Sequence, residues 1–109
     1  MPTSDTLEKE YQLLSLIEQQ PQLTQRQLAS ELGVSLGKTH YVLTALIERG
    51  LVKSGNFARS ANKSGYAYVL TPKGIKEKVV ITRAFLQRKM AEYDRITADI
   101  ARLHQELGE

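Results

Sequence analysis

The residues with the clearest chemical potential lie between positions 37 and 44, on one side of an expected helix. At about 100° per residue, Gly37, Tyr41 and Thr44 share that side and are flanked by Lys38 and His40. A phenol, a hydroxyl, an imidazole and a cation are groups that hydrogen-bond base edges and phosphates in a DNA major groove, and a glycine permits close approach. This pattern favours nucleic-acid contact, and docking of a partner protein is the alternative.

The helix that carries these groups is expected over residues 35–49. Ser35 is a good N-cap, and Gly50 follows as the residue that closes the helix. The opposite side is apolar except for one threonine, and it comprises Thr39, Val42, Leu43, Leu46 and Ile47. This side should face a core while the polar side remains open.

A shorter helix should precede it and be joined to it by a tight turn. Thr24 and Gln27 have the spacing of a capping box, and Gly33 suits the left-handed residue that ends a helix. Only residues 33–35 then separate the two helices, which predicts a helix-turn-helix. Arg26 on the first helix would contact phosphate.

A β-hairpin, or wing, is expected over residues 51–70. Residues 51–53 and 66–70 resemble strands, and the connection at 55–65 is rich in Gly, Asn and Ser. Lys53, Arg59 and Lys63 give the hairpin basic groups for phosphate contact, with a simple solvated loop as the alternative. From residue 35 to 78 the chain holds eight basic against two acidic residues, whereas residues 1–34 hold two against five. An anionic partner would suit this asymmetry.

A long helix should follow, because Thr71 and Pro72 start one and no Gly or Pro interrupts residues 75–107. With Val79 as heptad position a, eight of ten core positions are apolar, which predicts a coiled coil. Position a holds Val79, Leu86, Tyr93, Ile100 and Leu107, and position d holds Ile75, Thr82, Lys89, Ile96 and Leu103. Ile81 and Phe85 form a second stripe that should pack on the helix's own domain. The coil predicts a homodimer, in either strand direction, and a single helix lying on a monomer is the alternative.

The expected fold class is mainly α (α+β): a winged helix-turn-helix domain at 1–71, completed by a first helix through Gln19, and a dimerisation helix at 72–109. The 109 residues include no cysteine, and the composition of 41% hydrophobic and 25% charged residues is ordinary for a folded protein. No membrane span or signal peptide is indicated, so a cytoplasmic, nucleoid-associated location is expected. His40 and His104 lie on different helices and the chain has no Cys, which predicts no metal site. The sequence shows no Ser-His-Asp pattern and no phosphate-cradling Gly loop, so no enzyme activity and no cofactor are expected.

Two segments resemble a known family. TQRQLASELGVSLGKTHYVLTALIERGLV and, after the wing, GYAYVLTPKG are similar to the winged-helix core of MarR-type bacterial transcription regulators. The closest resemblance is to a small branch associated with exopolysaccharide (EPS) gene clusters. It implies a dimer that binds double-stranded DNA, with residues 35–44 in the major groove and the loop around Arg59 and Lys63 as wing. Larger MarR proteins dimerise through helices at both ends and hold ligands beneath, so the short N-terminal helix here departs from that pattern.

The sequence thus predicts a homodimeric, sequence-specific transcriptional regulator. An architectural protein that coats DNA without sequence preference is a second hypothesis, and a protein-docking winged helix is a third. In the first, Lys38, His40, Tyr41 and Thr44 read bases while the other basic groups hold phosphates. The sequence identifies no effector ligand, operator or sign of regulation.

Overall fold

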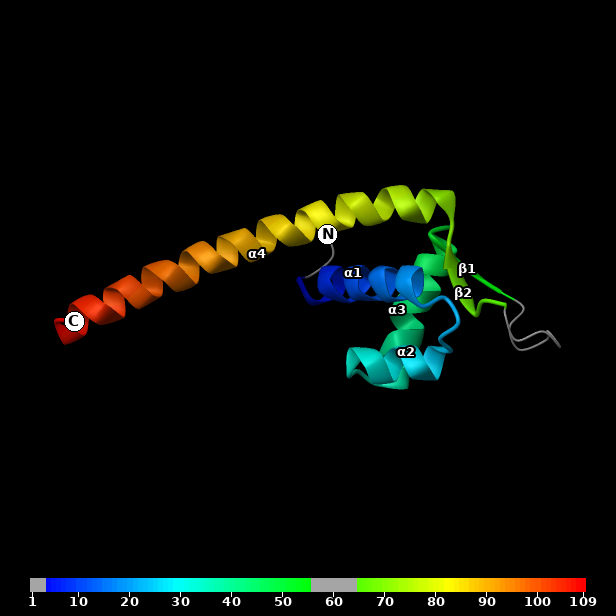
Figure 1. Ribbon diagram of the computed structural model, residues 1–109, viewed down its shortest axis with the longest axis horizontal. Helices are drawn as coiled ribbons and strands as arrows, with labels where there is room; N and C mark the ends of the chain where they lie inside the picture. Colours follow the sequence, from blue (N-terminus) through cyan, green and yellow to red (C-terminus); the bar gives the residue numbers. More distant parts are fainter. Residues whose placement is uncertain (1–3, 56–64) are drawn as a thin grey trace.

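A computed structural model describes residues 4–55 and 65–109 of the chain. Figure 1 shows a small helical domain from which one long helix projects. The elements in chain order are α1 (Ser4–Gln19), α2 (Gln25–Leu32), α3 (Leu36–Glu48), β1 (Val52–Ser54), β2 (Tyr68–Leu70) and α4 (Pro72–Leu107). The mainly α fold predicted from the sequence is confirmed.

The helix ends follow from local side-chain chemistry. Thr24 and Gln27 form the predicted capping box at the start of α2, and Gly33 ends that helix with φ 66°. Ser35 accepts a hydrogen bond from the Lys38 amide and so caps α3, which ends one residue earlier than expected, with Arg49 as its C-cap. These caps fix a turn of three residues between α2 and α3.

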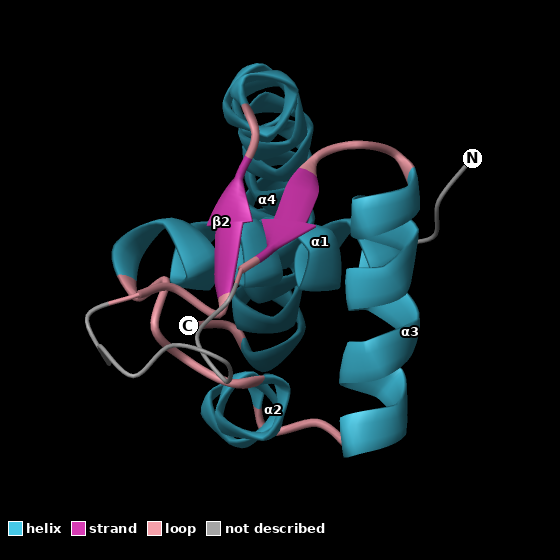
Figure 2. Ribbon diagram, turned by 90° about the vertical axis from the view of Figure 1, so that its right-hand side faces the viewer, coloured by secondary structure: helices cyan, strands magenta, loops and turns pink. Residues whose placement is uncertain are grey.

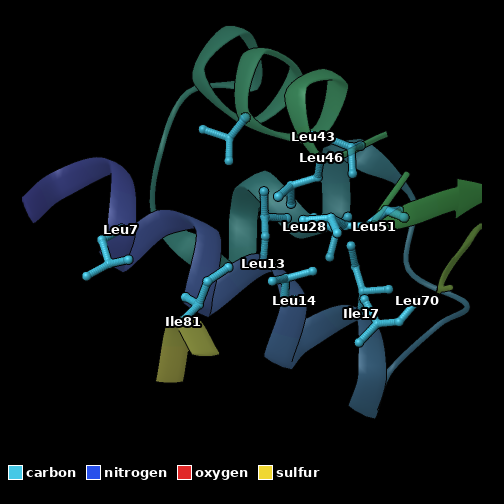
Figure 3. Close-up of a cluster of buried hydrophobic side chains, with 12 residues drawn as sticks. Leu7, Leu13, Leu14, Ile17, Leu28, Leu43, Leu46, Leu51, Leu70 and Ile81 are labelled. Atoms are coloured by element: carbon cyan, nitrogen blue, oxygen red, sulfur yellow. The ribbon is translucent and has the colours of Figure 1, made fainter. Parts of the chain in front are cut away.

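The core lies where α1 crosses the helix-turn-helix, as the close-up in Figure 3 shows. Leu7, Leu13, Leu14 and Ile17 of α1 are buried, and Leu13 is only 1% exposed. The other buried apolar residues include Leu28, Val42, Leu43, Leu46, Leu51, Val52, Leu70 and Ile81. The expectation that Ile47 shares this buried side was wrong, because it is 37% exposed at the edge of α3.

The sheet is a single antiparallel pair in which Val52 faces Leu70 and Ser54 faces Tyr68. Both strands differ from the expected ranges: β1 begins one residue later, and β2 lacks its first two predicted residues. For β2 the cause lies between α1 and α2, where the Pro21 carbonyl accepts hydrogen bonds from the amides of Ala67 (2.8 Å) and Tyr68 (3.2 Å). These bonds tie the start of β2 to the helical domain.

Helix α4 gives the molecule its extended shape, 67 × 25 × 22 Å. Its first turns lie along α1, and its C-terminal half extends past the domain with no other described element beside it (Figure 1). As predicted, Ile81 is buried, and the Phe85 ring stacks on Tyr11 with centroids 5.0 Å apart. In the described part of the chain, no helix has the length and apolarity needed to span a bilayer.

Candidate nucleic-acid interface

The outer face of α3 is open. In Figure 2, α3 stands at one edge of the domain, and no other described element lies beyond it. Tyr41 projects from this face with 72% of its surface exposed, and His40 is exposed beside it. Because Val42, Leu43 and the rest of the buried side hold α3 to the core, the exposed side chains project from a rigid element.

The N-terminal turn of α3 combines unpaired backbone donors with open space. The Ser35 hydroxyl takes up the Lys38 amide at 3.0 Å, and the remaining amides of the first turn lack intrahelical acceptors. A Cβ at Gly37 would meet only the Ser35 hydroxyl oxygen, 4.0 Å away. The positive end of the helix dipole and the absent side chain suit this turn to close approach by an anionic backbone.

His40 and Thr44 lie one turn apart on the same face. The Thr44 hydroxyl is 3.5 Å from Nε2 of His40, the outer limit of a hydrogen bond. Both side chains therefore retain most of their hydrogen-bonding capacity for an external partner. With Tyr41 they place a ring nitrogen, an aliphatic hydroxyl and a phenol within two turns of one helix.

Lys38 is held differently from its neighbours. Its ammonium lies 3.1 Å from a carboxylate oxygen of Asp5, in the first turn of α1, and both side chains are well exposed to solvent. The sequence analysis did not predict this contact, because the two residues are 33 positions apart. The free protein thus positions an acidic residue beside the predicted reading surface.

The predicted phosphate contacts are spread over separate elements. Arg26 is exposed in the first turn of α2, and Lys53 is exposed in β1. Arg59 and Lys63 lie outside the described residues. The structure therefore brings Ser35, Gly37, Lys38, His40, Tyr41 and Thr44 together on α3, with Arg26 and Lys53 on flanking elements.

A cluster of charged groups joins the C-terminal end of α3 to α1 and α4. The Arg49 guanidinium donates to Glu10 at 2.9 Å, and its other terminal nitrogen lies 3.9 Å from Glu77. Glu10 is 7% exposed, in line with Leu7 and Leu14 on the buried stripe of α1. A carboxylate on a buried stripe needs a partner, so the position of Glu10 was the sequence signal from which this cluster could have been predicted.

The predicted coiled-coil residues form one exposed stripe along α4, here called the α4 seam. Its members are between 48% and 70% exposed. Ile81, on a neighbouring side of α4, is buried instead. The seam comprises Ile75, Val79, Leu86, Tyr93, Ile96, Ile100, Leu103 and Leu107. Beside its first turns runs an apolar groove of about 450 Å³, lined by Ile75, Val79, Thr82 and Leu86 among others. So large an apolar stripe on one helix indicates an interaction surface.

Comparison with known proteins gives the same fold. A family model described as winged helix-turn-helix DNA-binding matches residues 7–53. A MarR family protein of Mycobacterium tuberculosis, solved with p-aminosalicylic acid, is 24% identical at a TM-score of 0.54, over 97% of this chain and 86% of that one. No curated protein matches the sequence.

Two further solved structures are similar. FabT of Streptococcus pneumoniae, in complex with DNA, is 24% identical at a TM-score of 0.54, covering 91% of this chain and 73% of that chain. A MarR transcriptional regulator from Methanosarcina mazei is 17% identical at 0.55, covering 94% and 83%. The chain thus carries a winged helix-turn-helix DNA-binding domain in the fold of the MarR-family transcriptional regulators.

Proposed function

We propose that this chain, which shares the fold of the MarR-family regulators, is a transcriptional regulator that binds a specific double-stranded DNA sequence as a homodimer. The observation that carries the proposal is the open outer face of α3, with Tyr41 72% exposed at its centre. A helix-turn-helix presents this face of its second helix to the major groove. The DNA complex of FabT, a protein of similar fold, supports the same use here.

Base reading in this proposal rests on Tyr41, His40 and Thr44. The phenol and hydroxyl both donate and accept hydrogen bonds, and the imidazole does one or both according to its protonation. The contact between His40 and Thr44 is long, so binding DNA sacrifices little interaction within the protein. Gly37 lets the helix backbone come close to the groove wall.

Lys38 contacts DNA after its ion pair with Asp5 breaks. Their ion pair is exposed to solvent, and exposed pairs contribute at most about 1 kcal/mol. A phosphate offers the lysine a stronger partner because binding also releases condensed counterions. Asp5 therefore acts as an intramolecular competitor that weakens binding to every DNA sequence.

The remaining basic residues contact phosphates and orient the protein on the duplex. Arg26 and Lys53 are exposed on elements next to α3. Arg59 and Lys63, which lie outside the described residues, are proposed to extend the contact along the backbone. Such contacts supply affinity without sequence information. The resemblance to the exopolysaccharide-associated branch extends the proposal to those genes as targets, with the protein located on the nucleoid in the cytoplasm.

Dimerisation through the α4 seam completes the proposal. The seam is apolar and exposed over most of a 36-residue helix, which a single copy cannot cover. Burying it against a second copy removes this surface from water and links two reading helices. Two linked half-sites give the affinity and specificity that one head lacks.

The test begins by selecting bound fragments from random DNA and sequencing them. On the selected site, Tyr41→Ala should weaken binding by about 1–3 kcal/mol, roughly 5- to 150-fold, with little effect on random DNA. Tyr41→Phe, which keeps the ring and removes only the hydroxyl, separates hydrogen bonding from packing. Lys53→Ala should weaken both DNAs equally, because a phosphate contact carries no sequence information.

Three outcomes would contradict the proposal. Equal losses for Tyr41→Ala on both DNAs would remove base readout from α3. Selection without any enriched sequence, despite tight binding, would favour an architectural coating protein. No DNA retardation at low salt would favour a protein-docking winged helix.

A further inference from the structure

The charges of α4 divide between its two halves. From residue 72 to 90 the helix carries six basic residues against one acidic, and from 91 to 107 it carries two basic against four acidic. At the heptad positions that flank the α4 seam, the first half places Lys76, Lys78 and Arg83, and the second half places Glu92, Asp99 and Glu106. Flanking charges set partner choice and strand direction in coiled coils.

A parallel pair would bring like charges together. It would place Lys78 beside Arg83 of the partner subunit and would set Lys89, at a core d position, directly against Lys89 of the partner subunit. Both contacts are repulsive, and the second lies within the seam itself. The basic halves of the two helices would also lie side by side, as would the acidic halves.

We infer that a second copy of this chain packs on the α4 seam in the antiparallel direction, with the crossing point near residue 91. This inference rests on the proposed dimerisation and assigns its geometry. In this register every core position meets a core position, so that Val79 faces the partner's Leu103 and Leu86 faces the partner's Ile96. At the flanks, Lys78, which pairs with Glu18 of its own chain, faces the partner's Glu106 at each end of the pair.

The groove beside the seam supports the same register. Its lining combines core positions of the first half of α4 with three charged residues: Ile75, Val79, Thr82, Leu86, Glu18, Lys78 and Arg83. In the antiparallel register, two apolar residues of the partner lie along this groove. The partner's Ile100 is opposite Thr82, and the partner's Leu107 is opposite Ile75. The C-terminal turns of α4, which have no described neighbour in one chain, thereby gain an apolar site.

Lys89 fits the centre of this arrangement. Its ammonium lies 5.3 Å from the Phe85 ring centroid and 3.3 Å from a carboxylate oxygen of Glu92. The charge therefore lies outside the seam, on the edge of α4 that carries Phe85 and Glu92. In an antiparallel pair, that edge of one helix meets the same edge of the other. Two lysines and two glutamates then alternate at the crossing point, which offsets the approach of Glu92 to its symmetry mate.

The domains fit on the outside of such a pair. Helix α1 packs on α4 through Ile81 and Phe85, and its Glu18 pairs with Lys78, all to one side of the seam, whose apolar members remain exposed. Because matching edges meet, both domains lie on one face of the two-helix rod. At about 1.5 Å per residue, the two Glu77 side chains, which mark the ends of the reading helices, are about 42 Å apart along the rod. Both heads can thus face one duplex at a spacing longer than one turn, ~34 Å.

The test uses the absence of cysteine from the chain, which makes engineered thiols unique. We propose two single variants of the full chain, Val79→Cys and Leu103→Cys, oxidised alone and as an equimolar mixture after exchange of subunits. The antiparallel register predicts a disulfide only between the two different variants in the mixture. Each variant alone has its thiols about 36 Å apart along the rod and stays uncrosslinked.

A second measurement avoids any change in the seam. Gln105→Cys lies on the outer side of α4 and carries a nitroxide label without entering the interface. Antiparallel packing predicts labels at least about 40 Å apart, whereas parallel packing predicts labels within about 25 Å, given helix diameters of about 10–12 Å. Pulsed electron paramagnetic resonance distinguishes these distances.

Charge reversal supplies a matched pair of variants. Glu106→Lys should raise the dimer dissociation constant about two- to tenfold, because it sets a lysine against the partner's Lys78 at both ends. Asp94→Lys makes the same charge change outside the flanking positions and should have little effect. Analytical ultracentrifugation measures both constants.

The outcomes separate this inference from the proposed function. Self-crosslinking of Val79→Cys with a short label distance overturns the antiparallel direction and leaves DNA regulation by a dimer intact. A monomer by ultracentrifugation, with no crosslink in any sample, overturns both the direction and the dimer. Mixed crosslinking alone, with a long label distance, supports the inference even if no DNA is bound.

Discussion

Replacing Gly74 with alanine tests how closely the start of α4 approaches the backbone that follows α3. Gly74 is the third residue of α4, and a Cβ there would overlap the Leu51 carbonyl oxygen and lie 2.9 Å from its carbonyl carbon. That carbonyl accepts a hydrogen bond from the Thr71 amide at 3.0 Å. The obstacle is hydrogen-bonded backbone, which cannot move aside without losing that bond.

The magnitude follows from opposing effects. Alanine in place of glycine stabilises a helix by up to about 1 kcal/mol. Overpacking costs about 1–3 kcal/mol, and loss of the Thr71 hydrogen bond adds about 0.5–1.5 kcal/mol. Gly74→Ala should therefore lower the free energy of unfolding by about 1–3 kcal/mol.

Urea unfolding followed by circular dichroism, at one fixed protein concentration, measures the change. Gly37→Ala is the matched control, because it makes the same substitution in the first turn of α3, where a Cβ meets open space. It should leave stability unchanged or raise it by up to about 1 kcal/mol. If Gly74→Ala proved as stable as the unaltered chain, the close approach of α4 to Leu51 would be refuted.

Three other substitutions test the charged contacts and the seam. Asp5→Asn should release Lys38 and so tighten binding to specific and random DNA alike by about two- to fivefold, as measured by fluorescence anisotropy. An unchanged affinity would show that the Lys38–Asp5 ion pair does not compete with DNA. Arg49→Met should lower the free energy of unfolding in urea by about 1–3 kcal/mol, because it leaves Glu10 buried without its partner. A smaller loss would mean that water reaches the Glu10 carboxylate. Tyr93→Ala should raise the dimer dissociation constant at least tenfold while leaving the helical content of the domain intact, because its ring is 69% exposed.

Local chemistry explains which elements the sequence predicted well. A capping box or a Thr-Pro helix start depends on residues within four positions of one another, so the starts of α2 and α4 follow from Thr24 and Thr71 alone. The exposed side of α3 followed from helical periodicity for the same reason, because Tyr41 lies opposite Val42 and Leu43 on the helix. The wing tip, with Arg59, remains a prediction because it lies outside the described residues.

Contacts between distant residues explain what the sequence did not predict. β2 starts at Tyr68 rather than Tyr66 because the preceding amide bonds to Pro21, 46 positions earlier in the chain. The ion pairs of Lys38 and Arg49 likewise span 33 and 39 positions. No local pattern encodes such partners, since the choice among several acidic residues of α1 depends on how α1 crosses α3. That crossing is set by packing of the whole core.

The junction between α3 and α4 determines what the proposed dimer geometry means for DNA binding. Thr71 donates its hydroxyl to the Gly50 carbonyl at 2.5 Å, and Lys73 donates to the Arg49 carbonyl at 3.0 Å, so the end of α3 is bonded directly to the first turn of α4. The helix-turn-helix domain is therefore held rigidly to α4, and in the proposed dimer the spacing of the two domains, or heads, depends on the length of α4 between them.

Inserting one extra heptad, a repeat of residues 91–97, tests this dependence. In an antiparallel pair it should move the heads about 10.5 Å further apart, or about three base pairs. Affinity for the site selected by the unaltered protein should then fall to that of a single head, while a new selection recovers a site with longer spacing. In a parallel pair the heads lie at the same end of the coil, so the insertion would leave the preferred site unchanged. An unaltered affinity, with helical content and dimer mass preserved, would refute the idea that α4 sets the spacing of the half-sites.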